Sequence, residues 1–422
     1  MPAASSRVPK NVAVLGVVSL LTDASSEAVY PILPLFLTSV LGAPVSAVGL
    51  IESIAEATGS IMRAFSGWFS DRIGKRKPLV VAGYTLSNLA KPLLAFTQTW
   101  PAVLLLRFTD RLGKGIRTAP RDALIADSGE ARTRGRDFGF HRALDTVGAA
   151  IGPLTAWAVL TMHPGAYRTV FIIAAIPGTL AILLVVFAVR ERPGHASAQA
   201  GGDTSASGGS PNGASEGSSA VPARDRPAIS FKHLGRPFAV FAVLSALFAV
   251  GNSSDAMLVL RAQDVGAAPA LIPLMYFVFN VVAAALAAPF GRLSDRVGRL
   301  RCIVAGFGGY AAVYAGFALV AHAYGVWFLF AAYGVPYALT EGLTRAYVVD
   351  LVPAQIRGTA IGSYTFLLGL AALPASTMAG LLWDSMGHAA PFWVSAALML
   401  TATVGLALAP GLPRGAAVSS AA

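Results

Sequence analysis

The sequence predicts an all-α integral membrane protein, with twelve transmembrane helices in two pseudo-repeated bundles of six around a central cavity. Its 422 residues are 55% hydrophobic and only 13% charged, with a mean hydropathy of +0.63, whereas soluble proteins carry about 25% charged residues. Apolar runs long enough to cross the hydrocarbon of a bilayer, about 20 residues each, recur twelve times. Motifs of the first half also return in the second half.

The predicted helices follow one another with short connections, apart from one long polar segment. The first six lie at about 11–40, 46–69, 78–98, 101–123, 138–162 and 168–189. The last six lie at about 237–261, 270–292, 301–322, 325–349, 359–382 and 390–410. The first run contains Pro31 and Pro34, and we expect it to be kinked or broken because proline removes a helical hydrogen bond.

A segment rich in Gly, Ser and Ala divides the chain at residues 193–232. It has too few apolar side chains to bury a core, so we interpret it as a linker. The predicted organisation is an N-terminal bundle at 1–192 and a C-terminal bundle at 233–422.

Internal repeats support this division. The octapeptide GWFSDRIG at 67–74 returns as GRLSDRVG at 291–298, 224 residues later. Asp127 is followed by an Arg-Gly pair at the same spacing as Asp350, 223 residues later. Two pairs in nearly the same register indicate that the halves are structural repeats.

The distribution of Lys and Arg predicts the topology. With twelve helices both termini lie on one side, and most basic residues of the short loops fall there, whereas the opposite loops carry essentially Arg168 and Arg261. Because basic loops stay in the cytoplasm, we expect the termini and the linker to be cytoplasmic in a plasma (inner) membrane protein. The net charge of +11 is dispersed over these loops and forms no stripe for nucleic acid.

Two motifs resemble those of the major facilitator superfamily. The first is its signature loop after the second helix, echoed in the second half, with the matching residues Gly67, Asp71, Arg72, Gly74, Lys75 and Gly291, Asp295, Arg296, Gly298. The second, in the fifth helix, is similar to the G-x-x-x-G-P motif of the antiporter or efflux branches, here Gly148, Gly152 and Pro153. The resemblance implies a monomeric transporter that works by alternating access.

For the loop motif the resemblance implies a lock that holds one gate state, and the alternative is that basic loops merely orient the helices. Glu341 and Arg345 are spaced to pair at i, i+4 on a helix end of the same side, where a gate role and a binding role are equally open. For the glycine motif the alternative is close helix packing with no bearing on transport direction.

Charged residues inside the predicted helices are the main chemical signal. Each costs about 2.5–3.5 kcal/mol at the bilayer centre, so we expect them to face the bundle interior. The candidates for substrate binding or proton coupling are Asp23, Glu27, Glu52, Glu56, Arg107, Asp110, Arg111, Asp145 and Asp255. Because the acidic residues of the first two helices and the basic residues of the fourth each share one face, we expect them to pair.

These charges have two interpretations. One is a static network of ion pairs, which is weak evidence for stability. The other is a site that binds a charged solute or relays protons, because neighbouring carboxylates titrate together. The second half is poorer in such residues, so the sequence places the charge chemistry in the first half.

The sequence therefore predicts a secondary transporter that exports a small solute or drug in exchange for protons. A proton-coupled uptake symporter and a membrane sensor that binds a ligand without moving it are the alternatives. Neither a nucleophile–base pairing nor a phosphate-binding glycine loop nor a metal-ligand spacing is found, so no enzyme activity, cofactor or metal is predicted. The expected partners are the lipid bilayer, a small molecule or ion, and protons.

Overall fold

The computed structural model describes residues 8–73, 76–128, 133–191, 234–353 and 356–413. The predicted linker at 193–232, together with Gly74 and Lys75 of the first motif, lies outside the described residues. The described chain is helical throughout, with short connections. Nine of its stretches are long and apolar enough to cross a membrane by length and composition.

All twelve predicted runs contain helix, and three of them are interrupted. The first half comprises α1 (Lys10–Val29), α2 (Leu33–Leu35), the π-helix η1 (Phe36–Val40), α3 (Val45–Ile73), α4 (Lys77–Leu94), α5 (Trp100–Ser128), α6 (Arg134–Met162) and α7 (Tyr167–Ala188). The second half comprises α8 (Gly235–Gly251), α9 (Ala256–Asp264), α10 (Ile272–Val297), α11 (Arg299–Leu319), α12 (Ala323–Thr340), α13 (Leu343–Asp350), α14 (Arg357–Met386) and α15 (Ala390–Leu408).

One of the three interruptions was predicted and two were not. The first run breaks after Val29, beside Pro31, as expected. The predicted single helices at 237–261 and 325–349 are each two helices, because the first opens after Gly251 and the second at Glu341. At the first break, short polar side chains compete for backbone hydrogen bonds, and the hydroxyl of Tyr314 donates to the carbonyl of Ser253 at 3.1 Å.

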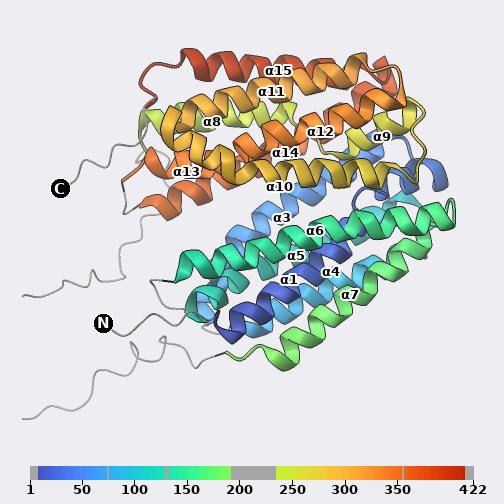
Figure 1. The fold of residues 1–422 in the computed structure, drawn as a ribbon, viewed down its shortest axis with the longest axis horizontal. Coiled ribbons are helices and arrows are strands. Elements are labelled where there is room, and N and C mark those ends of the chain that lie inside the picture. The colour runs from blue at the N-terminus through green and yellow to red at the C-terminus, as the bar shows by residue number, and fades with distance from the viewer. Residues whose placement is uncertain (1–7, 74–75, 129–132, 192–233, 354–355, 414–422) are drawn as a thin grey trace, which may run out of the picture.

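The two halves form two groups of helices that lie side by side (Figure 1). We call the end at which α7 ends and α8 begins the linker end, and the opposite end the far end. At the far end α3 and α14 are in contact, since Ser53 Oγ accepts a hydrogen bond from the Thr377 backbone at 2.9 Å. Asp384 also accepts from the Ser46 backbone N–H at 2.8 Å. These bonds between bundles close the far end.

A cavity of about 1260 Å³ lies between the bundles. It begins at mid-helix residues such as Asp23 and Asp255 and reaches Asp122 and Arg345 near the linker end. Each bundle therefore forms one wall of the central cavity, and the cavity is closed at the far end.

Candidate binding site in the central cavity

The two walls of the cavity differ in chemistry. The first bundle contributes mostly charged side chains, namely Asp23, Glu27, Arg63, Lys114, Arg117, Arg121, Asp122, Arg142 and Asp145. The second contributes Asp255, Tyr276, Phe279, Asn280 and Tyr337, with Glu341, Gly291 and Arg345 nearer the linker end. The predicted charge asymmetry between the halves is thus present in the walls of the cavity.

Glu52 and Arg107 form a buried ion pair behind the first wall. Arg107 Nη2 donates to both carboxylate oxygens of Glu52 at 2.8 and 3.0 Å, and the two side chains are 6% and 3% exposed. Arg107 also lies 3.4 Å from Asp110, which accepts a hydrogen bond of 2.5 Å from Ser87. The expected pairing of the second and fourth predicted helices is therefore confirmed here.

A second pair lies one turn away. Arg111 Nη2 is 3.3 Å from Glu56 Oε1, and the two side chains are 12% and 48% exposed. Because Glu56 keeps access to solvent while its partner is buried, this pair is the more accessible of the two to a solute or to water.

Two carboxyl groups meet between α1 and α6. Asp23 and Asp145 both line the central cavity and interact electrostatically, although the sequence favoured partners of Asp23 on the fourth helix. Asp145 also accepts a hydrogen bond from Ser19 and lies 3.1 Å from Arg142. Two neighbouring carboxyl groups of this kind titrate as a pair.

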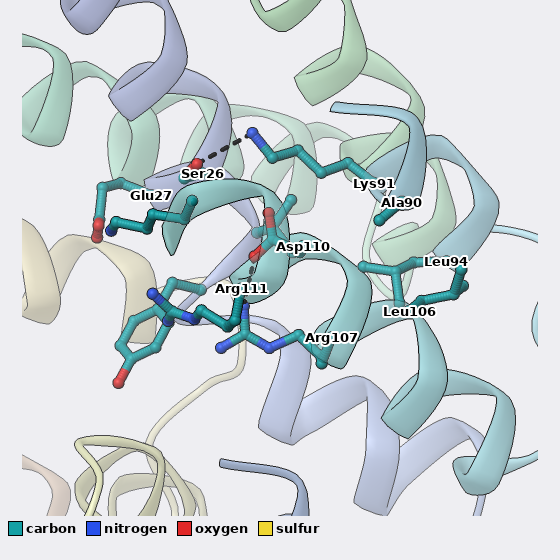
Figure 2. A pocket seen from close by; sticks show the side chains of 12 residues that line it. Ser26, Glu27, Ala90, Lys91, Leu94, Leu106, Arg107, Asp110 and Arg111 are labelled. Carbon is teal, nitrogen blue, oxygen red and sulfur yellow. Dashed lines mark hydrogen bonds and ion pairs between the residues drawn. The ribbon is translucent and has the colours of Figure 1, made fainter. Parts of the chain in front are cut away.

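Lys91, which is not among the predicted site residues, is buried beside the ion pairs (Figure 2). Its Nζ donates to Ser25 and Ser26 of α1, at 2.8 and 3.0 Å. It borders a small cavity of about 20 Å³ that also touches Glu27 and Lys114. The sequence marks it as a lone lysine within an apolar helix.

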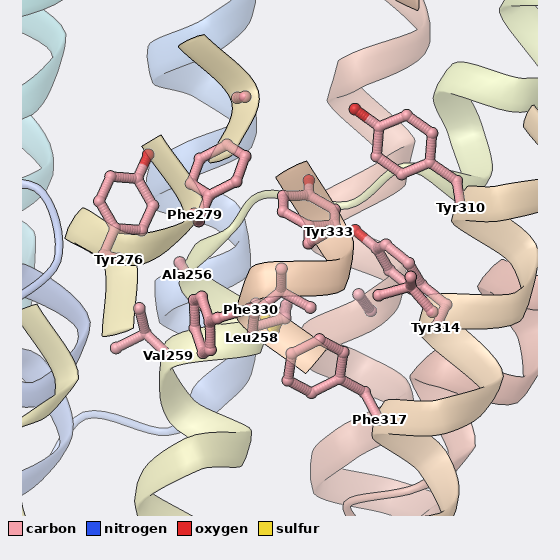
Figure 3. Close-up of a cluster of buried hydrophobic side chains, with 14 of the residues drawn as sticks. Ala256, Leu258, Val259, Tyr276, Phe279, Tyr310, Tyr314, Phe317, Phe330 and Tyr333 are labelled. Carbon is pink, nitrogen blue, oxygen red and sulfur yellow. The ribbon is translucent and has the colours of Figure 1, made fainter. Parts of the chain in front are cut away.

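Asp255 lies in the break between α8 and α9, on the second wall. Its two carboxylate oxygens accept hydrogen bonds from the hydroxyls of Tyr333 at 2.7 Å and Tyr276 at 3.2 Å. Both tyrosines belong to a buried aromatic cluster (Figure 3). The break in the helix therefore places a carboxylate against aromatic rings.

The motif at the linker end forms one equivalent contact in each half. Arg76 pairs with Asp127 and donates to the Ala123 carbonyl, and Arg299 pairs with Asp350 and donates to the Ala346 carbonyl. Each residue of the second set lies 223 positions after its counterpart. Arg76 and Arg299 lie at the end of the two copies of the loop motif in the sequence, and Asp127 and Asp350 belong to the repeats.

The other motif residues lie at or near this end. Arg72, Asp295 and Arg296 are exposed, whereas the side chain of Asp71 is outside the described part. Gly298 has φ of +97° between α10 and α11, a conformation that favours glycine. Glu341 and Arg345 are 3.4 Å apart, as their spacing predicts.

The glycine motif of α6 lies against α1. A side chain at Gly152 would meet the backbone nitrogen of Ala28 at 2.6 Å and the carbonyl carbon of Glu27 at 2.7 Å, and Gly148 faces the Leu20 backbone as closely. Pro153 lies within the same helix. The two glycines therefore permit backbone contact with the helix that carries Asp23 and Glu27.

A metal site has no support among the described residues, where no group of three or more His, Cys, Asp or Glu side chains is placed to hold an ion. The arrangement can instead bind charged and polar groups of a solute and hold protons on its carboxylates.

Comparisons with known proteins agree with this geometry. Residues 15–376 match the family described as Major Facilitator Superfamily, and residues 239–421 match it again. An uncharacterized MFS-type transporter of Methanocaldococcus jannaschii is 36% identical over 380 residues, which is 89% of this chain and 88% of the relative. The multidrug resistance protein MdtG of Salmonella typhimurium is 28% identical over 176 residues, 41% of this chain and 43% of that protein. The crystal structure of the nucleoside transporter NupG superposes with a TM-score of 0.73 at 13% identity, over 94% of this chain and 98% of that chain.

Proposed function

Because this chain belongs to the Major Facilitator Superfamily, we propose that it exports a small solute or drug in exchange for protons. It is a multi-pass membrane protein and a secondary transporter of a small molecule, and it is not an enzyme. Coupling to protons and export as the direction of transport are what we propose.

The closed far end and the cavity below it support a state with access from one side only. The basic loops favour the cytoplasm for the linker end, so this is the inward-facing state in a plasma (inner) membrane. Transport then requires the bundles, 1–192 and 233–422, to rock about the cavity until the far end opens and the linker end closes.

The observation that carries proton coupling is the placement of two interacting carboxyl groups, Asp23 and Asp145, at the cavity wall. A proton held by this pair can leave when a solute brings positive charge next to it, since a nearby cation favours the ionised carboxylate. A site that holds either the proton or the solute exchanges one for the other across the membrane.

Two observations favour export. Gly148 and Gly152 of the antiporter-like motif hold α6 against the α1 backbone next to Glu27, so the motif fixes the spacing of the carboxyl pair between these helices. The similarity to MdtG, described as a multidrug resistance protein, covers part of the chain and supports the same direction.

The test uses the full-length protein in sealed proteoliposomes that contain a pH dye and have an acidic lumen. A panel of drugs and metabolites is added outside, one compound at a time. Antiport predicts that a transported compound raises the luminal pH, because protons leave as it enters. An uptake symporter lowers the luminal pH under the same conditions, and a sensor produces no flux.

Asp23→Asn and Asp145→Asn should each abolish proton movement while exchange of labelled compound against unlabelled compound continues. Asp264→Asn is the matched control, because Asp264 pairs with Arg261 outside the cavity. Solute flux without any change of luminal pH would show that the coupling proposal is wrong.

A further inference from the structure

We infer that Asp255 and the aromatic side chains around it bind the ammonium group of the transported solute. The inference rests on the function proposed above and names the chemical class of the substrate. It gives the second bundle a binding role, whereas the sequence placed the charge chemistry in the first half.

The side chain of Asp255 does not cap the helix that follows it. Asp255 is the residue before α9, yet its side chain makes no capping hydrogen bond to that helix. Its oxygens instead accept from Tyr333 and Tyr276 and line the cavity. The carboxylate is therefore held in position from the side and turned towards the space between the bundles.

The charge of Asp255 has no cation to balance it on its own wall. Of the described residues that line the cavity from the second bundle, Glu341 and Arg345 pair with each other and leave Asp255 as the remaining charge. Two neutral hydroxyls compensate a carboxylate less fully than a cation does. A positively charged group of the solute would complete the site.

Aromatic rings lie next to this carboxylate, and Figure 3 shows those of Tyr276, Phe279 and Tyr333. The ring centroid of Phe279 lies 4.9 Å from that of Tyr333 and 5.2 Å from that of Tyr337. The ring centroid of Tyr276 lies 5.7 Å from that of Tyr30 in the first bundle. The faces of such rings attract ammonium groups. The apolar remainder of an organic amine is accommodated by the same rings.

A second feature of this wall is a hydrogen-bond donor that lacks an acceptor. Asn280 lines the cavity next to Phe279, and its Nδ2 is buried with no hydrogen-bond partner. A buried donor without a partner is costly, and an oxygen of the solute would satisfy it. The site is therefore suited to an aromatic or apolar amine that carries a hydroxyl, ether or carbonyl oxygen near its ammonium group.

The test is equilibrium binding to the purified full chain in lipid nanodiscs, measured by calorimetry without a pH gradient. The probes are phenethylammonium, its hydroxylated relative phenylethanolamine, the neutral 2-phenylethanol and the anionic phenylacetate. The two ammonium probes should bind at least tenfold more tightly than the neutral and anionic ones. Asp255→Asn should remove this preference, Asp255→Glu should retain it, and Asp264→Asn should leave it unchanged.

Asn280→Ala should weaken phenylethanolamine several-fold and leave phenethylammonium unchanged, which separates the acceptor contact from loss of folding. Unchanged ammonium binding in Asp255→Asn, equal binding of phenylacetate, or failure of both ammonium probes to bind would each overturn the inference. Because no gradient is used, intact ammonium binding in a protein that moves no protons would contradict the proposed function alone.

Discussion

Glu52 and Arg107 join helices α3 and α5 through two hydrogen bonds from one guanidinium nitrogen, with both side chains buried. Removing one partner leaves a buried charge without compensation, which costs about 3–5 kcal/mol. We therefore expect Arg107→Met to lower the free energy of unfolding by about that amount. The combined Glu52→Leu and Arg107→Met variant should recover most of the loss, as measured in a double-mutant cycle.

The same cycle separates the structural from the functional interpretation of this pair. If the double variant still transports, the pair is a structural tie between the two helices. Strictly additive losses of stability would contradict the expected coupling between the two side chains.

Gly152→Ala should push α6 away from α1. The added methyl group would lie 2.6 Å from the Ala28 nitrogen, and overpacking of this kind costs about 1–3 kcal/mol. Gly139→Ala in the same helix is the control, because nothing lies within 4 Å of the added atom; it should be neutral or stabilising. Thermal unfolding and flux of both variants check this, and equal behaviour would exclude the close contact as the cause.

Cross-linking the far end should stop transport. Gln263 Nε2 and Ser39 Oγ, from different bundles, are 2.8 Å apart. In a background with Cys302 replaced by Ala, cysteines at both positions joined by a short bismaleimide should abolish flux, because the far end can no longer open. Single-cysteine variants treated identically should retain it, and transport by the fully cross-linked protein would contradict alternating access through this end.

The paired contacts at the linker end should respond to charge exchange. Asp350→Arg places two basic groups together beside the Ala346 carbonyl, and the Arg299→Asp variant with Asp350→Arg restores opposite charges. Partly exposed pairs contribute about 0.2–1 kcal/mol to stability, so we expect a small change of unfolding and a larger loss of flux in the single variant. Recovery of flux in the double variant checks the pairing, and its absence would assign these side chains another role.

Much of the fold follows from the sequence because bilayer thickness fixes the length of each apolar run. The positions of the two unpredicted breaks do not follow, since neither Gly251 nor Glu341 is next to a proline. At Gly251 the break is accompanied by a hydrogen bond from Tyr314, a residue of another helix, to the buried carbonyl of Ser253. A contact of this kind, between helices far apart in the sequence, cannot be predicted from the hydrophobic pattern of a single helix.

The site shows the same division. The partners Glu52 and Arg107 were predictable because each lies on a charged face of its own helix. Asp23 and Asp145 were not predicted as partners, because their meeting depends on the close approach of α1 and α6 that Gly148 and Gly152 permit. Asn280 stands out in the sequence as an amide within an apolar helix, but its unpaired Nδ2 is visible only in the structure, beside the cavity.

The contacts of Arg76 and Arg299 are the same in both halves, whereas the side chains that line the cavity are not. Duplication of a six-helix ancestor would leave this pattern if each copy kept the Arg–Asp contact at the linker end while the surfaces facing the cavity diverged. The Arg–Asp contacts then serve the conformational change that both halves share, whereas the residues that select the solute are free to change. Altering the cavity wall should thus change what is carried without rebuilding how the halves move.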